Sequence, residues 1–90
     1  MLQIEFTTQF KKDYQLILKR GYNPQKLMEV ISMLQRQIIL PPEYRDHKLQ
    51  GQYSGYRECH IAPDWLLIYR VKQEVLTLVL SRTGSHSDLF

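Results

Sequence analysis

The stretch that decides the fold reads Gly55-Tyr-Arg-Glu-Cys-His-Ile-Ala-Pro-Asp-Trp-Leu-Leu-Ile-Tyr69. Its Ala62-Pro63-Asp64 segment places proline, with its preset φ, where a tight turn needs it. The flanking segments, residues 55–61 and 65–71, are therefore predicted to pair as antiparallel strands. The segment that starts at Trp65 is almost continuously apolar, which is typical of a central strand covered on both sides. This hairpin is the predicted middle of a sheet.

Two further strands are predicted on either side of the hairpin in sequence. Leucines alternate with less apolar residues over 75–82, after a polar triplet at 72–74 that suits a hairpin loop. Residues 2–6 show the same period of two and predict a short N-terminal strand.

Two helices are predicted between the N-terminal strand and the hairpin. Apolar residues recur at helical spacing over residues 8–20, and again from Asn23-Pro24 to near Leu40, where Pro41-Pro42 stops the second helix. The short turn between them predicts an antiparallel helical hairpin. Residues 43–54 follow neither period and predict a long polar loop.

The order of these elements predicts an α+β fold in a single domain spanning residues 1–90. An N-terminal strand and a helical hairpin pack on an antiparallel sheet in the order β-α-α-β-β-β. At the C-terminal end, Ser85 and Asp88 are predicted to cap a single helical turn.

Composition places the chain among globular proteins. Twelve Lys and Arg against nine Asp and Glu give a formal net charge of +3, which is compatible with an anionic partner without being diagnostic of one. A hydrophobic share of 43% excludes a disordered chain. The single cysteine cannot form an internal disulfide, and neither a signal sequence nor an apolar run of the ~20 residues that a membrane helix needs is found. We therefore expect a cytoplasmic protein without membrane contact.

Three histidines fall in the second half of the chain, at His47, His60 and His86. They belong to the predicted loop, a predicted strand end and the C-terminal tail, which can converge on one face of a sheet. Because side chains alternate along a strand, Glu58 shares a face with His60. An acid and an imidazole on one face are candidates for proton transfer.

A purely structural interpretation of these residues stays open. Glu58 and His60 can satisfy each other as a pair on a solvated sheet. Asp64, which follows Pro63, can simply complete the turn. Each histidine taken alone is an ordinary side chain. A catalytic cluster requires convergence, which the sequence allows without showing.

The spacing of the remaining side chains disfavours metal and thiol sites. Cys59 and His60 diverge to opposite faces of a strand, and neither C-x₂-C nor H-x₃₋₅-H spacing occurs, so no zinc site and no cofactor is expected. Nothing places a base on the face of Cys59, which we expect to pack as a small apolar residue. The scattered acids disfavour a two-metal nuclease.

Proton transfer without a metal is sufficient to cleave RNA. The 2′-OH is an internal nucleophile that needs a base to remove its proton and an acid to protonate the leaving 5′-oxygen. Nearby cations can hold phosphate, and aromatic rings can stack on a base. The candidate cations are Arg45, Lys48, Arg57 and Arg82, and the candidate rings are Tyr53, Trp65 and Phe90.

Four segments together resemble one protein family. They are Tyr44-Arg-Asp-His-Lys-Leu-Gln-Gly51, Gly55 to Trp65, Ile68-Tyr69, and Arg82-Thr-Gly-Ser-His86 with Leu89-Phe90. In length and element order the chain is similar throughout to the YafQ-type toxins of the RelE/ParE superfamily. The resemblance implies a RelE-like fold and a toxin of a bacterial type II toxin–antitoxin pair that cleaves mRNA in the ribosomal A site. Its implied partners are an antitoxin protein, the ribosome and mRNA.

The resemblance also implies roles for individual residues. The implied proton-transfer cluster is His47, His60, Asp64 and His86. In it His86 is the general acid, and Asp64 with His60 or His47 orients the 2′-OH or accepts its proton. The implied substrate contacts are Arg82, Lys48, Phe90 and Glu58. Lys48 stands where related toxins often have proline and is expected to add a phosphate contact, whereas Glu58 replaces an aspartate and its role stays open.

Two other functions are compatible with this chain. A toxin of the ParE branch shares the fold but binds DNA gyrase without cleaving nucleic acid, and it would have no use for a cluster of histidines. An RNA-binding module would hold RNA without cutting it.

Overall fold

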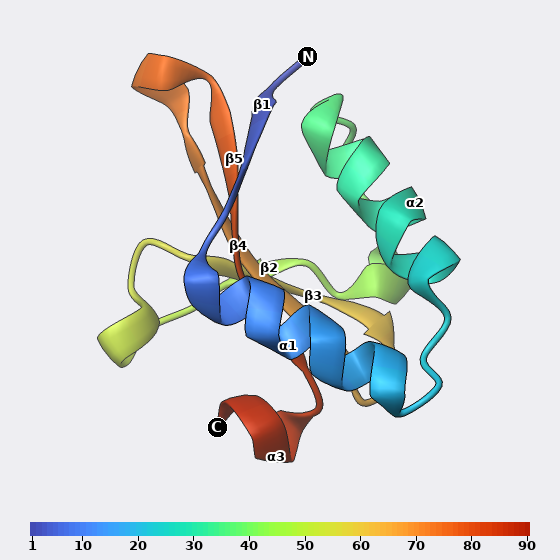
Figure 1. The fold of residues 1–90 in the computed structure, drawn as a ribbon. Coiled ribbons are helices and arrows are strands. Elements are labelled where there is room, and N and C mark those ends of the chain that lie inside the picture. The colour runs from blue at the N-terminus through green and yellow to red at the C-terminus, as the bar shows by residue number, and fades with distance from the viewer.

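A five-stranded sheet with two helices against one face forms the body of the protein (Figure 1). The computed structural model describes all residues, 1–90. The strands are β1 (Gln3–Phe6), β2 (His47–Lys48), β3 (Arg57–Ala62), β4 (Trp65–Lys72) and β5 (Thr77–Gly84), and their order across the sheet is β1-β5-β4-β3-β2. The helices are α1 (Thr8–Lys19), α2 (Pro24–Gln35) and α3 (His86–Leu89). The predicted α+β class is confirmed.

The sheet contains the predicted antiparallel meander and one parallel pair. Strands β3, β4 and β5 pair antiparallel in sequence order, and β1 lies beside β5 in the parallel direction. The last strand ends at Gly84 rather than near Arg82. The strand begins after the turn Gln73–Val75. Leu76 follows this turn with a φ of 47° and its side chain is exposed, whereas Leu78 and Leu80 are buried in the core.

The predicted loop 43–54 contains a short edge strand. In β2, His47 and Lys48 pair antiparallel with Glu58 and Arg57 of β3. Two residues are too few to show a period of two, so no pattern in the sequence reveals this strand. Its pairing brings His47 next to Glu58, and this contact builds much of the candidate site.

The ends of the helices follow from identifiable caps. The Thr7 hydroxyl accepts a hydrogen bond from the backbone N–H of Phe10 at 3.0 Å and caps the start of α1. Helix α2 ends at Gln35, before the predicted end near Leu40. Gln37 has a φ of 58° and closes a Schellman motif, in which the N–H of Ile38 binds the carbonyl of Met33. Glycine is the usual residue at that position, so Gln37 gives no sequence signal that α2 ends here.

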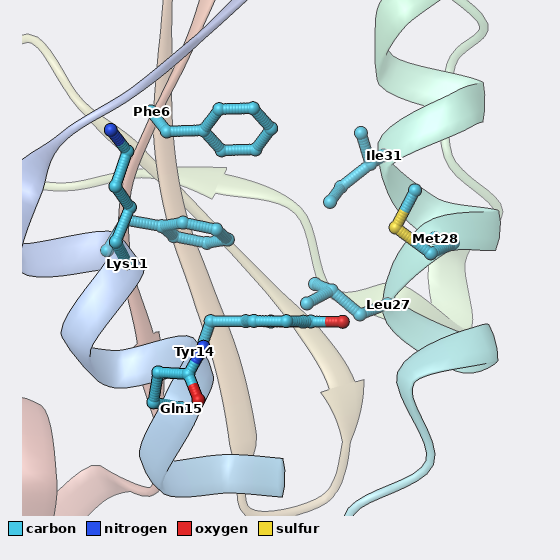
Figure 2. Close-up of a pocket in the computed structure, with 8 residues that line it drawn as sticks. Phe6, Lys11, Tyr14, Gln15, Leu27, Met28 and Ile31 are labelled. Carbon is cyan, nitrogen blue, oxygen red and sulfur yellow. The ribbon is translucent and has the colours of Figure 1, made fainter.

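The two helices do not form the predicted antiparallel hairpin. They diverge, because α1 packs against β5 while α2 packs toward β3 (Figure 1). Between them an apolar groove of about 430 Å³ remains open, with Phe6 and Tyr14 facing Met28 and Ile31 across it (Figure 2). Phe6 is 47% exposed and Met28 is 50% exposed, so a sizeable apolar surface faces solvent here.

The two faces of the sheet have different roles. Cys59, Leu67 and Leu80 belong to the main core beneath α1 and α2. On the opposite face, Leu66 and Ile68 form a smaller cluster with Leu89 of α3. This burial on both sides is what the apolar sequence after Trp65 predicts. None of the helices could span a membrane.

Candidate active site

All four sequence-predicted members of the proton-transfer cluster, together with Glu58, form one series of neighbouring side chains. They are contributed by β2, β3, the β3–β4 turn and α3, which are far apart in sequence. A bulge in the β3–β4 pairing between His60 and Ala62 re-aims the strand next to the site. The expected convergence of the three histidines therefore has a structural basis in the sheet register.

The Glu58 carboxylate lies between two histidines. Its Oε1 is 3.5 Å from Nε2 of His47 and 3.6 Å from Nε2 of His60. The Glu58 side chain is only 7% exposed, and these two rings are its ion-pair neighbours. Parity places Cys59 in the opposite core, as predicted, and burial raises the pKa of its thiol well above the ordinary value.

The orientation of the His47 ring is determined by a backbone carbonyl. Its Nδ1 lies 2.7 Å from the carbonyl oxygen of Arg45. A carbonyl can only accept a hydrogen bond, so Nδ1 carries a proton and Nε2 is the nitrogen directed at Glu58. Arg45 itself has a φ of 49°, a left-handed conformation that turns the chain into β2.

Asp64 holds the ring and the backbone of His86. Its Oδ1 accepts hydrogen bonds from the His86 backbone N–H at 2.9 Å and from Nδ1 at 2.7 Å. Both hydrogen bonds lower the pKa of the Asp64 carboxyl group, and the bond from the backbone N–H has the larger effect. Because Nδ1 donates to Asp64, Nε2 of His86 is free for a substrate. The His86 ring also lies near His60, with centroids 5.8 Å apart.

The short helix α3 is anchored so that His86 keeps its place. The predicted capping box is confirmed: the Ser85 hydroxyl accepts from the Asp88 N–H, and the Asp88 carboxylate accepts from the Ser85 N–H at 2.9 Å. Arg20 of α1 also donates to Asp88 and lowers the pKa of its carboxyl group. A Cβ at Gly84 would lie 3.0 Å from the Asp88 carboxylate, so glycine permits this close packing.

A polar cleft of about 490 Å³ opens beside His60. It is lined by Glu43, Tyr44, Arg45 and residues 61–63. It places a guanidinium, a carboxylate and an aromatic ring near His60, which suits a polar ligand better than an apolar one.

Arg82 is held by an acid of α1. Asp13 of α1 accepts from Nε of Arg82 at 2.8 Å and from its Nη2 at 3.1 Å, and it also accepts from the N–H of Thr83. The Asp13 bond raises the pKa of Arg82. Asp13 is a charged residue of α1 that is nevertheless buried. Its spacing of three from Phe10 and four from Ile17 is the signal that could have found it.

Two other candidate side chains serve the core. Arg57 pairs with Asp46, whose carboxylate also accepts from the Tyr69 hydroxyl at 2.6 Å on the helix side of the sheet. Burial and this bond raise the pKa of Tyr69. Trp65 is buried and donates to the Thr83 hydroxyl at 2.9 Å, so its ring is not available to a base.

The remaining predicted substrate contacts are exposed. Phe90 is 62% exposed and its ring meets Tyr53 edge-on, with centroids 5.6 Å apart. Tyr53 meets Tyr56 in the same way, so the three rings form a continuous aromatic surface on the site face. Lys48 is exposed on the edge strand beside His47 and lines a second groove with Arg57 and Arg70.

The chain matches one family of known proteins over almost its whole length. Residues 2–90 match the family described as the bacterial toxin of type II toxin–antitoxin system, YafQ. The chain is similar to the mRNA interferase toxin YafQ of Escherichia coli K12, with 41% identity over 97% of this chain and 94% of that protein.

Solved structures agree with the family match. A metal-bound toxin from Helicobacter pylori is 43% identical, with a TM-score of 0.94 and full coverage of both chains. The E. coli DinJ-YafQ complex contains a chain that is 40% identical, with a TM-score of 0.90 over 100% of this chain and 99% of that one.

Proposed function

This chain belongs to the YafQ family of bacterial type II toxins, and we propose that it is an mRNA interferase that cleaves mRNA in the A site of translating ribosomes. Its site of action is then the cytoplasm. The observation that carries the proposal is the continuous array Asp64–His86–His60–Glu58–His47 on one face of the sheet.

The proposed reaction is transesterification by the RNA itself. A base removes the 2′-OH proton, the 2′-oxygen bonds to the adjacent phosphorus, and the bond to the 5′-oxygen breaks as an acid protonates it. The products are a 2′,3′-cyclic phosphate and a 5′-hydroxyl end. Two imidazoles in opposite protonation states supply both proton transfers.

His86 is the proposed general acid. Its Nδ1 is engaged by Asp64, so its Nε2 is the nitrogen that meets the leaving oxygen. Asp64 is assigned a positioning role, since its Oδ1 accepts from both the backbone N–H and Nδ1 of His86. The proposed base is His60, and the charge of Glu58 stabilises the imidazolium that forms when His60 takes the 2′-OH proton. His47 supports the same carboxylate from the other side.

The substrate contacts follow from exposure and charge. Arg82 keeps one terminal nitrogen free of Asp13 and can hold the scissile phosphate. Phe90 and Tyr53 provide a stacking surface for a base, and Lys48 adds a phosphate contact at the edge of the sheet.

Purified protein added to translating ribosomes tests the proposal against the two alternatives. We expect mRNA to be cut within the codon in the A site, while supercoiling by DNA gyrase is unaffected. Inhibited gyrase with intact mRNA would instead identify a ParE-like toxin, and bound but uncut mRNA would identify an RNA-binding module.

The groove between α1 and α2 is the surface that we assign to the antitoxin. It exposes apolar side chains of both helices, which a protein segment can bury, and Lys11 lines it on one side (Figure 2). The complementary segment is apolar, with an acidic residue placed opposite Lys11. Because this surface lies on the helix side, antitoxin binding there leaves the histidines accessible.

Met28→Glu is expected to weaken antitoxin binding by about 10–100-fold, because it places a charge in the centre of an apolar contact. Titration of the antitoxin by calorimetry measures the change, and cleavage of mRNA by the free toxin should be retained. Ser32→Glu, which adds the same charge on α2 outside the groove, is the matched control. Equal affinities for the two variants would show that the antitoxin binds elsewhere.

A further inference from the structure

We propose that Asp46 is a positioning residue for mRNA cleavage, because it determines where His47, its neighbour in the chain, is held. The carrying observation is that the Asp46 carboxylate accepts hydrogen bonds from the Tyr69 hydroxyl at 2.6 Å and from Nε and Nη2 of Arg57, each at 3.2 Å. The effect on cleavage rests on the function proposed above, whereas the effect on the His47 ring does not.

The strand that carries His47 is too short to hold its own position. β2 has two residues and lies at the edge of the sheet, so it is paired with β3 alone. The chain enters β2 from Arg45, whose φ of 49° is uncommon for a residue other than glycine. A segment with so few backbone hydrogen bonds opens locally more easily than a long strand does. The geometry of β2 therefore depends on side-chain contacts at its ends.

Asp46 supplies such a contact at the N-terminal end of β2. Its side chain is 22% exposed and Tyr69 is buried, so the hydrogen bond between them is largely shielded from water. Arg57 of β3 and Tyr69 of β4 are cross-strand partners, and both donate to this one carboxylate. These three side chains, which we call the Asp46 clamp, tie the edge segment to β4 in the centre of the sheet.

The Asp46 clamp acts on His47 from the opposite face of the sheet. Tyr69 belongs to the core beneath the helices, whereas the His47 ring lies beside Glu58 on the site face. Side chains alternate between the two faces along a strand, so holding Asp46 on one face holds the next side chain on the other. The carbonyl that accepts from Nδ1 of His47 belongs to the peptide unit that joins Arg45 to Asp46, so the clamp also steadies the acceptor that orients the ring.

His47 in turn determines the surroundings of the proposed base. Its Nε2 lies 3.5 Å from the carboxylate of Glu58, which also lies 3.6 Å from Nε2 of His60. A displaced His47 leaves this carboxylate with one neighbour instead of two, and the carboxylate is then free to move away from His60. Loss of the clamp should therefore slow the chemical step while the binding of ribosomes is retained.

Tyr69→Phe tests the clamp with the least disturbance of the core, because it removes only the hydroxyl group. We expect the single-turnover rate of mRNA cleavage to fall by about 3–10-fold, the usual effect of one lost hydrogen bond, with the ribosome concentration at half-saturation unchanged. Tyr14→Phe removes a hydroxyl from a tyrosine of α1 that packs against the same core, and it should cleave as the wild type does. In a His47→Ala background, Tyr69→Phe should cause no further loss, because the clamp acts through the missing ring.

Nitrogen-15 NMR of the histidine rings in the free protein measures the effect on His47 directly. The bond to the Arg45 carbonyl predicts that the neutral His47 ring of the wild type carries its proton on Nδ1, and Tyr69→Phe should mix the two tautomers. Asp46→Ala, which changes a partly exposed side chain, should have the same effect. His86, which lies outside the clamp, is the internal control and should keep its tautomer.

An unchanged His47 tautomer in both Tyr69→Phe and Asp46→Ala would overturn the clamp. A changed tautomer together with wild-type cleavage would overturn its role in the reaction. Absence of cleavage by the wild-type protein would instead count against the proposed nuclease function, and the ring spectra would still decide whether the clamp holds His47.

Discussion

Replacing His86 by alanine is expected to lower the rate of ribosome-dependent mRNA cleavage by about 10²–10⁴-fold, the usual effect of losing a general acid. The side chain of His86 is more than half exposed and its ring contributes little to the core, so the protein should fold normally. Single-turnover cleavage of mRNA on stalled ribosomes measures the loss, and circular dichroism with thermal unfolding checks the fold.

Two comparisons make this result specific. Ser87→Ala changes the next residue of α3, also exposed, and should retain most of the activity. Asp64→Asn leaves the His86 ring in place but offers a donor as well as an acceptor to Nδ1, so cleavage should fall by less than in His86→Ala. A well-folded His86→Ala variant that cleaves at the wild-type rate would remove His86 from the mechanism.

Replacing Asp13 by alanine is expected to destabilise the protein by about 1–3 kcal/mol, because the buried N–H of Thr83 and the guanidinium of Arg82 both lose their partner. The loosened Arg82 should also lower cleavage by about 10–100-fold, as expected when a phosphate-binding group is misplaced. Denaturant unfolding measures the first effect, and the single-turnover assay measures the second.

A double-mutant cycle separates a positioning role of Asp13 from a merely structural one. If Asp13 acts on cleavage through Arg82, the double variant with Arg82→Ala should cleave no more slowly than Arg82→Ala alone. Lys12→Ala, at the exposed neighbouring position of α1, is the control for helix substitution. Additive losses of cleavage would show that Asp13 acts independently of Arg82.

The fold could be predicted where the sequence carries strong local signals. Pro63 in a tight turn and the apolar run from Trp65 each determine their own element, and the structure confirms them. The end of α2 and the position of Leu76 were predicted wrongly, because Gln37 and Leu76 adopt left-handed conformations that glycine usually marks. The divergence of the helices depends on which strand each one packs against, which no local pattern records.

The sequence predicted which side chains come near one another better than it predicted their contacts. Strand parity alone put Glu58 and His60 on one face and Cys59 on the other. The contact of Glu58 with His47 depends on a two-residue strand, and the contact of Asp13 with Arg82 joins residues far apart in the chain. Such pairings come from tertiary packing, so the sequence suggested which side chains gather at the candidate site but not which of them contact one another.

The chemistry of the cut ends tests the account most directly. Ribosome-bound mRNA is treated with the purified protein, and the new 5′ ends are mapped. The ends are labelled with and without prior phosphorylation, which distinguishes a 5′-hydroxyl from a 5′-phosphate. Attack by the 2′-OH predicts 5′-hydroxyl ends paired with 2′,3′-cyclic phosphates, formed by the wild type and nearly lost in His86→Ala. New ends that carry a 5′-phosphate would show that water is the nucleophile and would contradict the proposed use of the histidine cluster.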